Sequence, residues 1–351
     1  MNDSYFNFST HVAESWWERW IFMRKWWQIY ASDQRWTPPF YPRLRRLLVS
    51  GNSWAGAQID RTYLHLEAFP RRRSSTGVGT ALFEEVVAAG VVTIDRRRPQ
   101  PAAYLQLFHC VNDEDVLDQF LAKVMEHLWS QGIYHFVGPL GPSPFLQSGV
   151  LHNYFHVTPP LYTAYNPPYL PEFMESSLTP WQHLQLFQQP ISLTVAIAPV
   201  KQIIPDRNIT LSPLAVSRLA EDLLPLWQIA CRALGDFLAP DQNDTCFMLQ
   251  WLQEWPLWGW LATVADEPVG FVLLQPDLAL ALRRANGGRT YLWRWWLQWR
   301  SRRNVRAGRL PYEAVAPAWR GRGIGRLLWQ QALWSAQQQG WQHLSVAGGD
   351  R

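Results

Sequence analysis

The two halves of this 351-residue chain repeat one order of structural elements. In each half, apolar runs typical of strands lead into a helical segment that ends at a glycine, and another short apolar run follows. Laid over each other without gaps, "SQGIYH" falls on "QQGWQH", so that Gly132 coincides with Gly340 and His135 with His343. A repeat of this kind predicts two similarly folded domains, because each copy can build the same local packing.

The order of the elements predicts an α+β fold in which each domain has a mixed, mostly antiparallel sheet flanked by helices. We place the first domain at residues 1–190 and the second at 191–351. In the first copy we expect a helix over 113–132 between strands at 102–111 and 133–141. In the second copy we expect a helix over 220–234, a hairpin over 258–276, and then strand, helix and strand at 310–317, 324–340 and 341–348.

The stretch "AVAPAWRGRGIGRLLWQQAL", residues 314–333, joins an apolar run to a helix through a loop of glycine and arginine. Such loops bind phosphate, because glycine lets the backbone approach an anion and a helix N-terminus carries partial positive charge. In the repeat register, Gly321 and Gly323 of this loop coincide with Asp113 and Asp115. Carboxylates repel phosphate, so we expect a polyphosphate to bind only in the C-terminal copy.

Two nucleotide-binding patterns do not fit this loop. Walker A requires G-x-x-x-x-G-K-[ST], and the sequence contains no such lysine-containing run. The Rossmann pattern G-x-G-x-x-G/A places Arg326 or Leu328 where its third small residue should be. Asp350 lies close to the place of the acid that follows in the Rossmann pattern, but the missing small residue disfavours a dinucleotide site.

The order [RQ]-x-x-G-x-[GA], here Arg320 to Gly325 after a run ending in "V-x-P", resembles the GNAT superfamily of coenzyme-A-dependent N-acyltransferases. The hairpin sequence "ADEPVGFVLLQP" is similar to the one that precedes this motif in the family. In the first half, "IYASDQRWTPP", "GPLGP" and "YNPPYLPEFMES" resemble a bacterial group of tandem GNAT-like proteins whose N-terminal copy is degenerate. The resemblance implies that the loop binds the pyrophosphate of acetyl-CoA through Arg320, Gly321, Arg322, Gly323, Ile324, Gly325 and Arg326.

The family resemblance also implies that an amine attacks the thioester directly. A main-chain N–H on the strand before the loop would then receive the thioester oxygen, which maps to Ala314 or Val315. Glu313 is the candidate base that removes a proton from the amine, and the alternative is a solvated or salt-bridged strand glutamate. Tyr312 points to the other face of that strand, where we expect it to pack.

The printed sequence stops at Arg351, directly after the run "HLSVAG". The resemblance implies a further helix and one or two strands after that run, so we expect the C-terminal copy to lack them. Either a shortened gene product or completion by another segment or subunit would explain the difference. An unfinished sheet would expose an edge that can pair with a second copy of the chain.

Composition limits the remaining possibilities. The hydrophobic fraction of 48% allows a full core, and we find neither a secretory signal nor an apolar run long enough to span a membrane. Three widely spaced cysteines indicate a reducing compartment, and we expect a cytoplasmic protein. His152 and His156 have no evident third ligand, so we expect no metal. The net charge of +4 is weak evidence for nucleic acid.

The segment "YLWRWWLQWRSRR" interleaves tryptophan with arginine. It could suit a membrane surface, RNA or an acidic substrate. The interpretation we favour is an inserted helix with tryptophans packed on the domain and arginines in water.

Our leading hypothesis is an N-acetyltransferase that transfers an acetyl group from acetyl-CoA to a small-molecule or peptide amine. A non-catalytic acyl-CoA-binding or scaffold protein is the first alternative. An aminoacyl transferase of tandem GNAT fold is the second, and the CoA-type loop argues against it.

Overall fold

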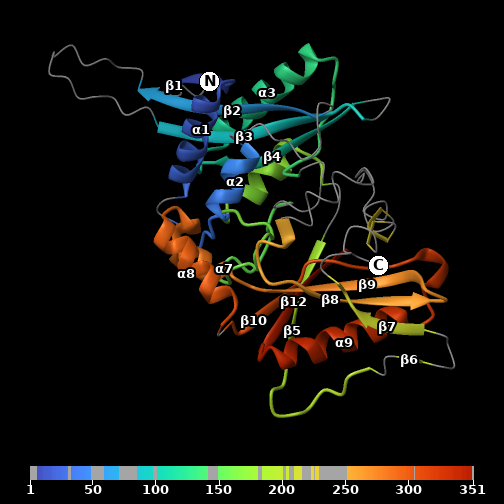
Figure 1. Ribbon diagram of the computed structural model, residues 1–351. Coiled ribbons are helices and arrows are strands. Elements are labelled where there is room, and N and C mark those ends of the chain that lie inside the picture. The colour runs from blue at the N-terminus through green and yellow to red at the C-terminus, as the bar shows by residue number, and fades with distance from the viewer. Residues whose placement is uncertain are drawn as a thin grey trace. The chain divides into compact units, whose positions relative to one another are not determined.

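The computed structural model divides into two compact units, residues 1–158 with 162–179 and residues 159–161 with 180–351 (Figure 1). It describes residues 6–30, 33–48, 59–70, 85–97, 101–140, 149–180, 184–200, 203–204, 209–215, 223–224, 226–228, 251–303 and 305–349. We expected the first domain to end at residue 190. In the structure, residues 180–190, with a strand at 184–190, belong to the second unit.

The first unit is an antiparallel sheet with helices on both faces. The strand order is β1-β2-β3-β4. Helix α1 covers one face, where Phe22 meets Tyr63 of β2, and α3 and α4 build the core on the other face. The elements are β1 (Phe6–Ala13), α1 (Trp16–Ile29), α2 (Tyr41–Leu48), β2 (Ile59–Pro70), β3 (Glu85–Asp95), β4 (Ala102–Cys110), α3 (Glu114–Ser130) and α4 (Leu170–Ser177).

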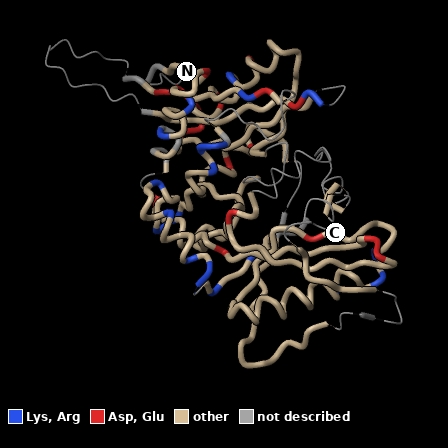
Figure 2. Tube along the Cα trace, viewed as in Figure 1, with Lys and Arg blue, Asp and Glu red and all other residues tan. Residues whose placement is uncertain are grey.

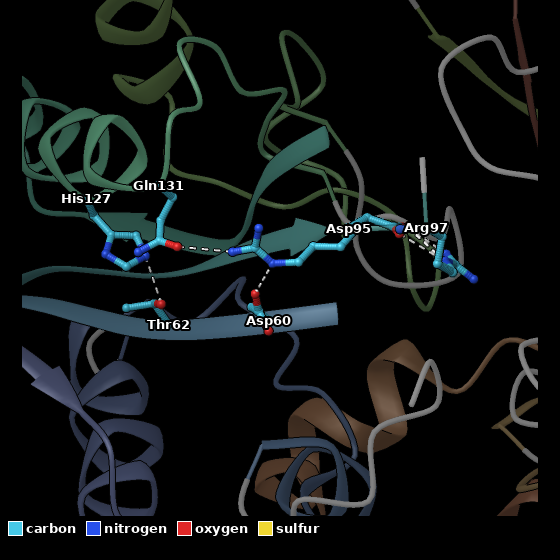
Figure 3. Close-up of polar contacts among 7 residues, drawn as sticks. Asp60, Thr62, Asp95, Arg97, His127 and Gln131 are labelled. Atoms are coloured by element: carbon cyan, nitrogen blue, oxygen red, sulfur yellow. Dashed lines mark hydrogen bonds and ion pairs between the residues drawn. The ribbon is translucent and has the colours of Figure 1, made fainter. Parts of the chain in front are cut away.

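Helix α3 confirms the helix expected over 113–132. Asp113 is its N-cap and accepts a hydrogen bond from the N–H of Val116 at 3.4 Å. Figure 3 shows how polar side chains tie its C-terminal turn to the sheet. His127 meets Thr62 of β2 at 3.0 Å, and Gln131 accepts from Arg96, whose Nε lies 2.5 Å from Asp60.

The strand expected over 133–141 is reduced to a single parallel bridge between Val137 and Tyr104. Pro139 follows directly and has no N–H to continue a ladder. Gly138 also lies against β4, since a Cβ built on it would be 2.8 Å from the carbonyl oxygen of Leu105. Past Pro139 a further bond joins the N–H of Leu140 to the carbonyl of Leu105 at 2.7 Å, so the segment follows β4 as the expected parallel neighbour without forming a regular strand.

The second unit is a mixed sheet with strand order β5-β12-β10-β9-β8-β7-β6, and β11 pairs with β9 off this path. Among the described strand pairs of this sheet, β10 and β12 run parallel to each other and the other pairs are antiparallel. Helix α9 packs on one face of the sheet. The strands are β5 (Leu184–Pro190), β6 (Ile203–Ile204), β7 (Ile209–Pro213), β8 (Trp258–Val264), β9 (Glu267–Pro276), β10 (Ala307–Leu310), β11 (Glu313–Val315) and β12 (His343–Gly349). The helices are α7 (Ala279–Arg284), α8 (Tyr291–Ser301) and α9 (Ile324–Gln338), with short 3₁₀ turns η4 (Asn286–Gly288) and η5 (Pro317–Trp319).

The hairpin expected over 258–276 is confirmed as β8 and β9. Ala265 and Asp266 form its turn with φ of +48° and +65°, the left-handed conformation that matches the twist of a two-residue hairpin. The expected strands and helix of the C-terminal copy appear as β10 with β11, α9 and β12. Of the helix expected over 220–234, only residues 223–224 and 226–228 lie within the described part.

The open edge expected beside β12 is instead occupied by β5. Residues His343 to Gly349 pair antiparallel with Leu184 to Pro190 along the whole length of both strands. In Figure 1 the yellow-green β5 lies beside the red β12. This pairing joins segments far apart in the sequence, so element order along the chain gave no sign of it. Of the alternatives given above, completion by another segment is confirmed for this edge, and the expectation of an open edge at β12 that a second copy of the chain could pair with is wrong.

The two copies share their helix packing position by position. In the ungapped register, buried Val116, Phe120, Val124 and Leu128 of α3 coincide with buried Ile324, Leu328, Ala332 and Ala336 of α9. Both helices also end in the same hydrogen bonds. Ile133 N–H donates to Leu128 carbonyl at 2.9 Å, and Trp341 N–H donates to Ala336 carbonyl at 3.0 Å. These bonds follow Gly132 and Gly340, which have φ of +73° and +71° and so end each helix in the left-handed conformation.

Candidate functional site

The glycine- and arginine-rich loop leaves the sheet at β11 and opens helix α9. Gly321 and Gly323 have φ of +75° and +84°, a region that side chains with a Cβ rarely adopt. Gly323 is the N-cap of α9, and no side chain caps the helix in its place. Glycine suits these positions because the chain takes the left-handed conformation twice between the 3₁₀ turn η5 and the helix.

The start of α9 presents unbonded N–H groups. The first helical hydrogen bond runs from Leu327 N–H to Gly323 carbonyl at 3.1 Å, so the N–H groups of Ile324, Gly325 and Arg326 have no acceptor within the helix. Space is open beside them, since a Cβ built on Gly325 would meet only Val315, at 3.9 Å, among the described atoms. An anion can therefore approach these N–H groups closely.

Three arginines surround the loop, and all are exposed. The Nε of Arg320 donates to the carbonyl of Val315 at 3.2 Å, at the end of β11. The guanidinium of Arg322 lies 4.6 Å from the centre of the Trp319 ring. Arg326 stands on the first turn of α9. Cations here add charge-assisted bonds to whatever anion the N–H groups bind.

A pocket of about 440 Å³ lies at this loop, lined by Ile209, Trp319, Gly321, Arg322 and Gly323. The sequence motif contained the glycines and Arg322 of this lining. It missed Trp319 and Ile209, which supply its apolar walls. Trp319 could have been found from its place beside the first arginine of the loop, whereas Ile209 comes from β7 and only the sheet brings it near.

The strand before the loop, β11, is not paired with β12, although β10 just before it is. β10 pairs parallel with β12 at Ala307 to Leu310, but β11, which continues the chain, pairs with β9. Bonds to β9 involve the carbonyl of Tyr312 and the N–H of Ala316, both even-numbered positions. Because N–H directions alternate along an antiparallel strand, Ala314 N–H faces β9, and Val315 N–H faces the side where β12 has separated.

Glu313 and Tyr312 lie on opposite faces of this strand. Glu313 is exposed and shares a face with Val315, which packs against the core beneath α9. Tyr312 lies on the other face, with its ring centre 4.5 Å from that of Trp227. The expected packing role of Tyr312 agrees with this contact.

The corresponding place in the first unit holds carboxylates. Asp113 is bonded to the N-terminus of α3, and Glu114 and Asp115 occupy its first turn. The Oγ of Ser176, on α4, donates to Glu114 at 2.6 Å. Negative charge at this helix start would repel a phosphate. The two helix starts therefore differ in charge, although the two helices share their packing.

Among the described residues, no group of three or more histidine, cysteine, aspartate or glutamate side chains could hold a metal ion. His152, considered above as half of a histidine pair, lies 3.5 Å from Glu175. No helix in the described ranges is both long and apolar enough to cross a membrane.

Residues 221–349 match the acetyltransferase (GNAT) family. The matched residues lie within the C-terminal unit and include the 320–326 loop. The tandem GNAT protein from the clavulanic acid biosynthesis pathway, solved without AcCoA, matches 98% of this chain and 90% of its own at 10% identity, with a TM-score of 0.55. This likeness shows that the chain has the fold of a tandem GNAT protein, with the second copy of the fold in the N-terminal unit.

Two further structures are similar with lower scores. A GCN5-related N-acetyltransferase from Sphaerobacter thermophilus has 13% identity over 98% of this chain and 87% of its own, with a TM-score of 0.48. The glucosamine N-acetyltransferase region of a fungal multi-domain GH3 β-N-acetylglucosaminidase has 15% identity over 97% of this chain and 35% of its own, with a TM-score of 0.49. A comparison with curated protein sequences found no significant match.

Proposed function

We propose that the C-terminal GNAT domain binds acetyl-CoA at the 320–326 loop and transfers its acetyl group to an amine. The observation that carries the proposal is the uncapped start of α9, where N–H groups, left-handed glycines and exposed arginines meet beside a pocket. Backbone donors at a helix N-terminus suit a diphosphate, and CoA carries one. The family match of residues 221–349 supports the same assignment.

Each residue would serve one need of the reaction. Bound acetyl-CoA supplies a thioester whose carbonyl carbon an amine can attack, with the CoA thiolate leaving. The N–H groups of Ile324, Gly325 and Arg326 hold the diphosphate, and Arg320 and Arg322 add positive charge. The N–H of Val315 donates to the carbonyl oxygen as negative charge develops there. Its direction away from β9 supports Val315 over Ala314 for this role.

Glu313 is the proposed general base. An ammonium group cannot attack a carbonyl, so a proton must leave the amine first. Glu313 is exposed on the strand that carries Val315, two residues away on the same face. A purely structural glutamate at this place would leave turnover unchanged when its charge is removed.

The first experiment is a calorimetric titration of the full chain with acetyl-CoA. We expect saturable binding, and absence of binding at millimolar ligand would overturn the proposal together with the non-catalytic alternative. Release of CoA thiol is then measured over a panel of amines. Binding without thiol release would favour the acyl-CoA-binding alternative over the enzyme.

The second experiment replaces Glu313 by glutamine. We expect kcat to fall by about a hundredfold or more with acetyl-CoA affinity unchanged, because removing a general base affects the chemical step. Glu126→Gln is the matched control, since Glu126 is an exposed carboxylate of the first unit. Equal turnover in both variants would assign Glu313 a structural role and leave the CoA site standing.

A further inference from the structure

A helical insertion separates two strands that are neighbours in the sheet of the second unit. β9 ends at Pro276 and β10 begins at Ala307, and the two strands pair antiparallel. Between them lie α7, η4 and α8. The insertion is anchored by buried Leu282 and Leu297 and by Gln298, whose amide donates to the carbonyl of Glu254 at 3.4 Å. It is therefore an ordered addition to the domain.

The outward face of α8 carries apolar side chains, so the favoured packing of tryptophans on the domain is wrong for Trp295 and Trp299, whereas Arg302 and Arg303 are exposed as expected. Its inner face buries Leu297 and Ser301. Tyr291, Trp295 and Trp299 follow one another at four-residue spacing and form a single outer stripe, with exposed fractions of 83%, 71% and 41%. Leu292 lies beside the stripe and is 82% exposed. We call these four side chains the α8 face.

The surrounding segment is strongly basic. Residues 277–306 contain eight arginines and one acidic residue, Asp277, so the insertion carries +7, which leaves −3 for the rest of a chain whose total is +4. Figure 2 shows the basic positions gathered along this insertion. Arg302 continues the outer stripe of α8 and is exposed, and Arg303 lies 5.9 Å from the ring centre of Trp299. The exposed apolar side chains of the α8 face thus lie within a segment of strong positive charge.

We propose that α8 binds the surface of an anionic phospholipid membrane, with the α8 face inserted among the headgroups. Tryptophan and tyrosine favour the boundary between headgroups and acyl chains, because one end of each ring system is apolar and the other polar. Arginines beside such a face attract anionic lipids. Together these features are the signature of a helix that lies in the membrane interface.

A nucleic acid would use the aromatic rings and the arginines but not the aliphatic groups. Leu292 on α8 and Leu280 on α7, 82% and 63% exposed, offer a single strand neither stacking nor a hydrogen bond. Acyl chains reward their burial. The exposed leucines therefore favour lipid as the occupant. The inference is independent of acyl transfer, since the insertion contributes none of the residues assigned to the CoA site.

The test is co-sedimentation of the full chain with large unilamellar vesicles, made either of phosphatidylcholine alone or of equal parts phosphatidylcholine and phosphatidylglycerol. We expect binding to the anionic vesicles that weakens as salt is raised. Leu292→Ser combined with Trp295→Ser should weaken binding by at least about tenfold, since several buried carbon groups are lost. Replacing Arg302 and Arg303 by glutamine should weaken it by about fivefold for each arginine.

Matched controls come from exposed residues of the first unit. Trp129→Ala and Arg45→Gln remove the same residue types from α3 and α2, and both should bind vesicles as the parent does. Thermal denaturation of every variant confirms folding. Absence of vesicle binding, or equal binding by the α8 variants and the controls, overturns the proposal. Binding of a single-stranded RNA oligonucleotide in place of vesicles, lost in the same α8 variants, overturns it in favour of nucleic acid.

Discussion

Helices α3 and α9 occupy the same place in the two units and differ chiefly at their first turn. Four buried positions coincide along their length, and both end at a left-handed glycine. At the start, however, α3 is capped by Asp113, whereas α9 begins at uncapped Gly323. The same packing of a helix on its sheet therefore accommodates two differently capped N-termini. A side chain of the chain itself accepts from one N–H at the start of α3, whereas no side chain caps the start of α9.

The largest expected effect comes from transferring the charge of the first copy into the second. Gly323→Asp places a carboxylate where Asp115 lies in the repeat register, and repulsion between unit charges at close range is about 4 kcal/mol. We expect acetyl-CoA affinity, measured by calorimetry, to fall about a thousandfold.

Two control variants separate charge from size in that experiment. Gly323→Asn has nearly the same volume, and asparagine tolerates the left-handed conformation, so it should lose far less affinity. Asp115→Asn in the first unit should leave binding unchanged. Equal losses for the aspartate and asparagine variants would show that space rather than charge decides, and the contrast between the copies would then need another explanation.

The next effect tests whether the shared core positions are equivalent in energy. Phe120→Ala in α3 and Leu328→Ala in α9 each remove a fully buried side chain, at a cost of about 3 kcal/mol in the free energy of unfolding. Hydrogen exchange followed by mass spectrometry on the full chain should show faster exchange in the unit that carries the substitution. Faster exchange in both units from either variant would mean that the copies unfold together.

The smallest effect tests the common helix ends. Gly132→Ala and Gly340→Ala each force a Cβ into the left-handed region, which costs about 1 kcal/mol, although neither Cβ would meet a neighbour within 4 Å. Because the two ends share their hydrogen bonds, the losses should be equal within error in urea denaturation or local hydrogen exchange. Unequal losses would show that the backbone likeness hides a difference in local strain.

Much of this architecture could be predicted from local pattern. The helix over 113–132, the hairpin over 258–276 and the strand and helix around the loop follow from caps, turns and periodicity, which act between residues close in sequence. The glycine- and arginine-rich loop at the start of α9 could be predicted for the same reason. Its glycines, its arginines and the helix they open lie within a few residues of one another.

Other features required contacts that no local pattern encodes. The sequence order predicted the repeat, but it could not show that β5 would pair with β12, since either strand could have found another partner. It also could not choose between Ala314 and Val315, because the direction of an N–H depends on which neighbour the strand bonds.

The sequence alone therefore determined the two-copy organisation and the glycine- and arginine-rich loop that opens α9, because both depend on short-range chemistry. The tertiary structure alone decided which strand completes the second sheet, which backbone N–H faces the opening, and which side of α8 meets water. Those outcomes depend on burial against distant segments. The pattern of "YLWRWWLQWRSRR" is the same whichever face is buried, and only the domain beneath it selects Leu297 and Ser301 for the interior.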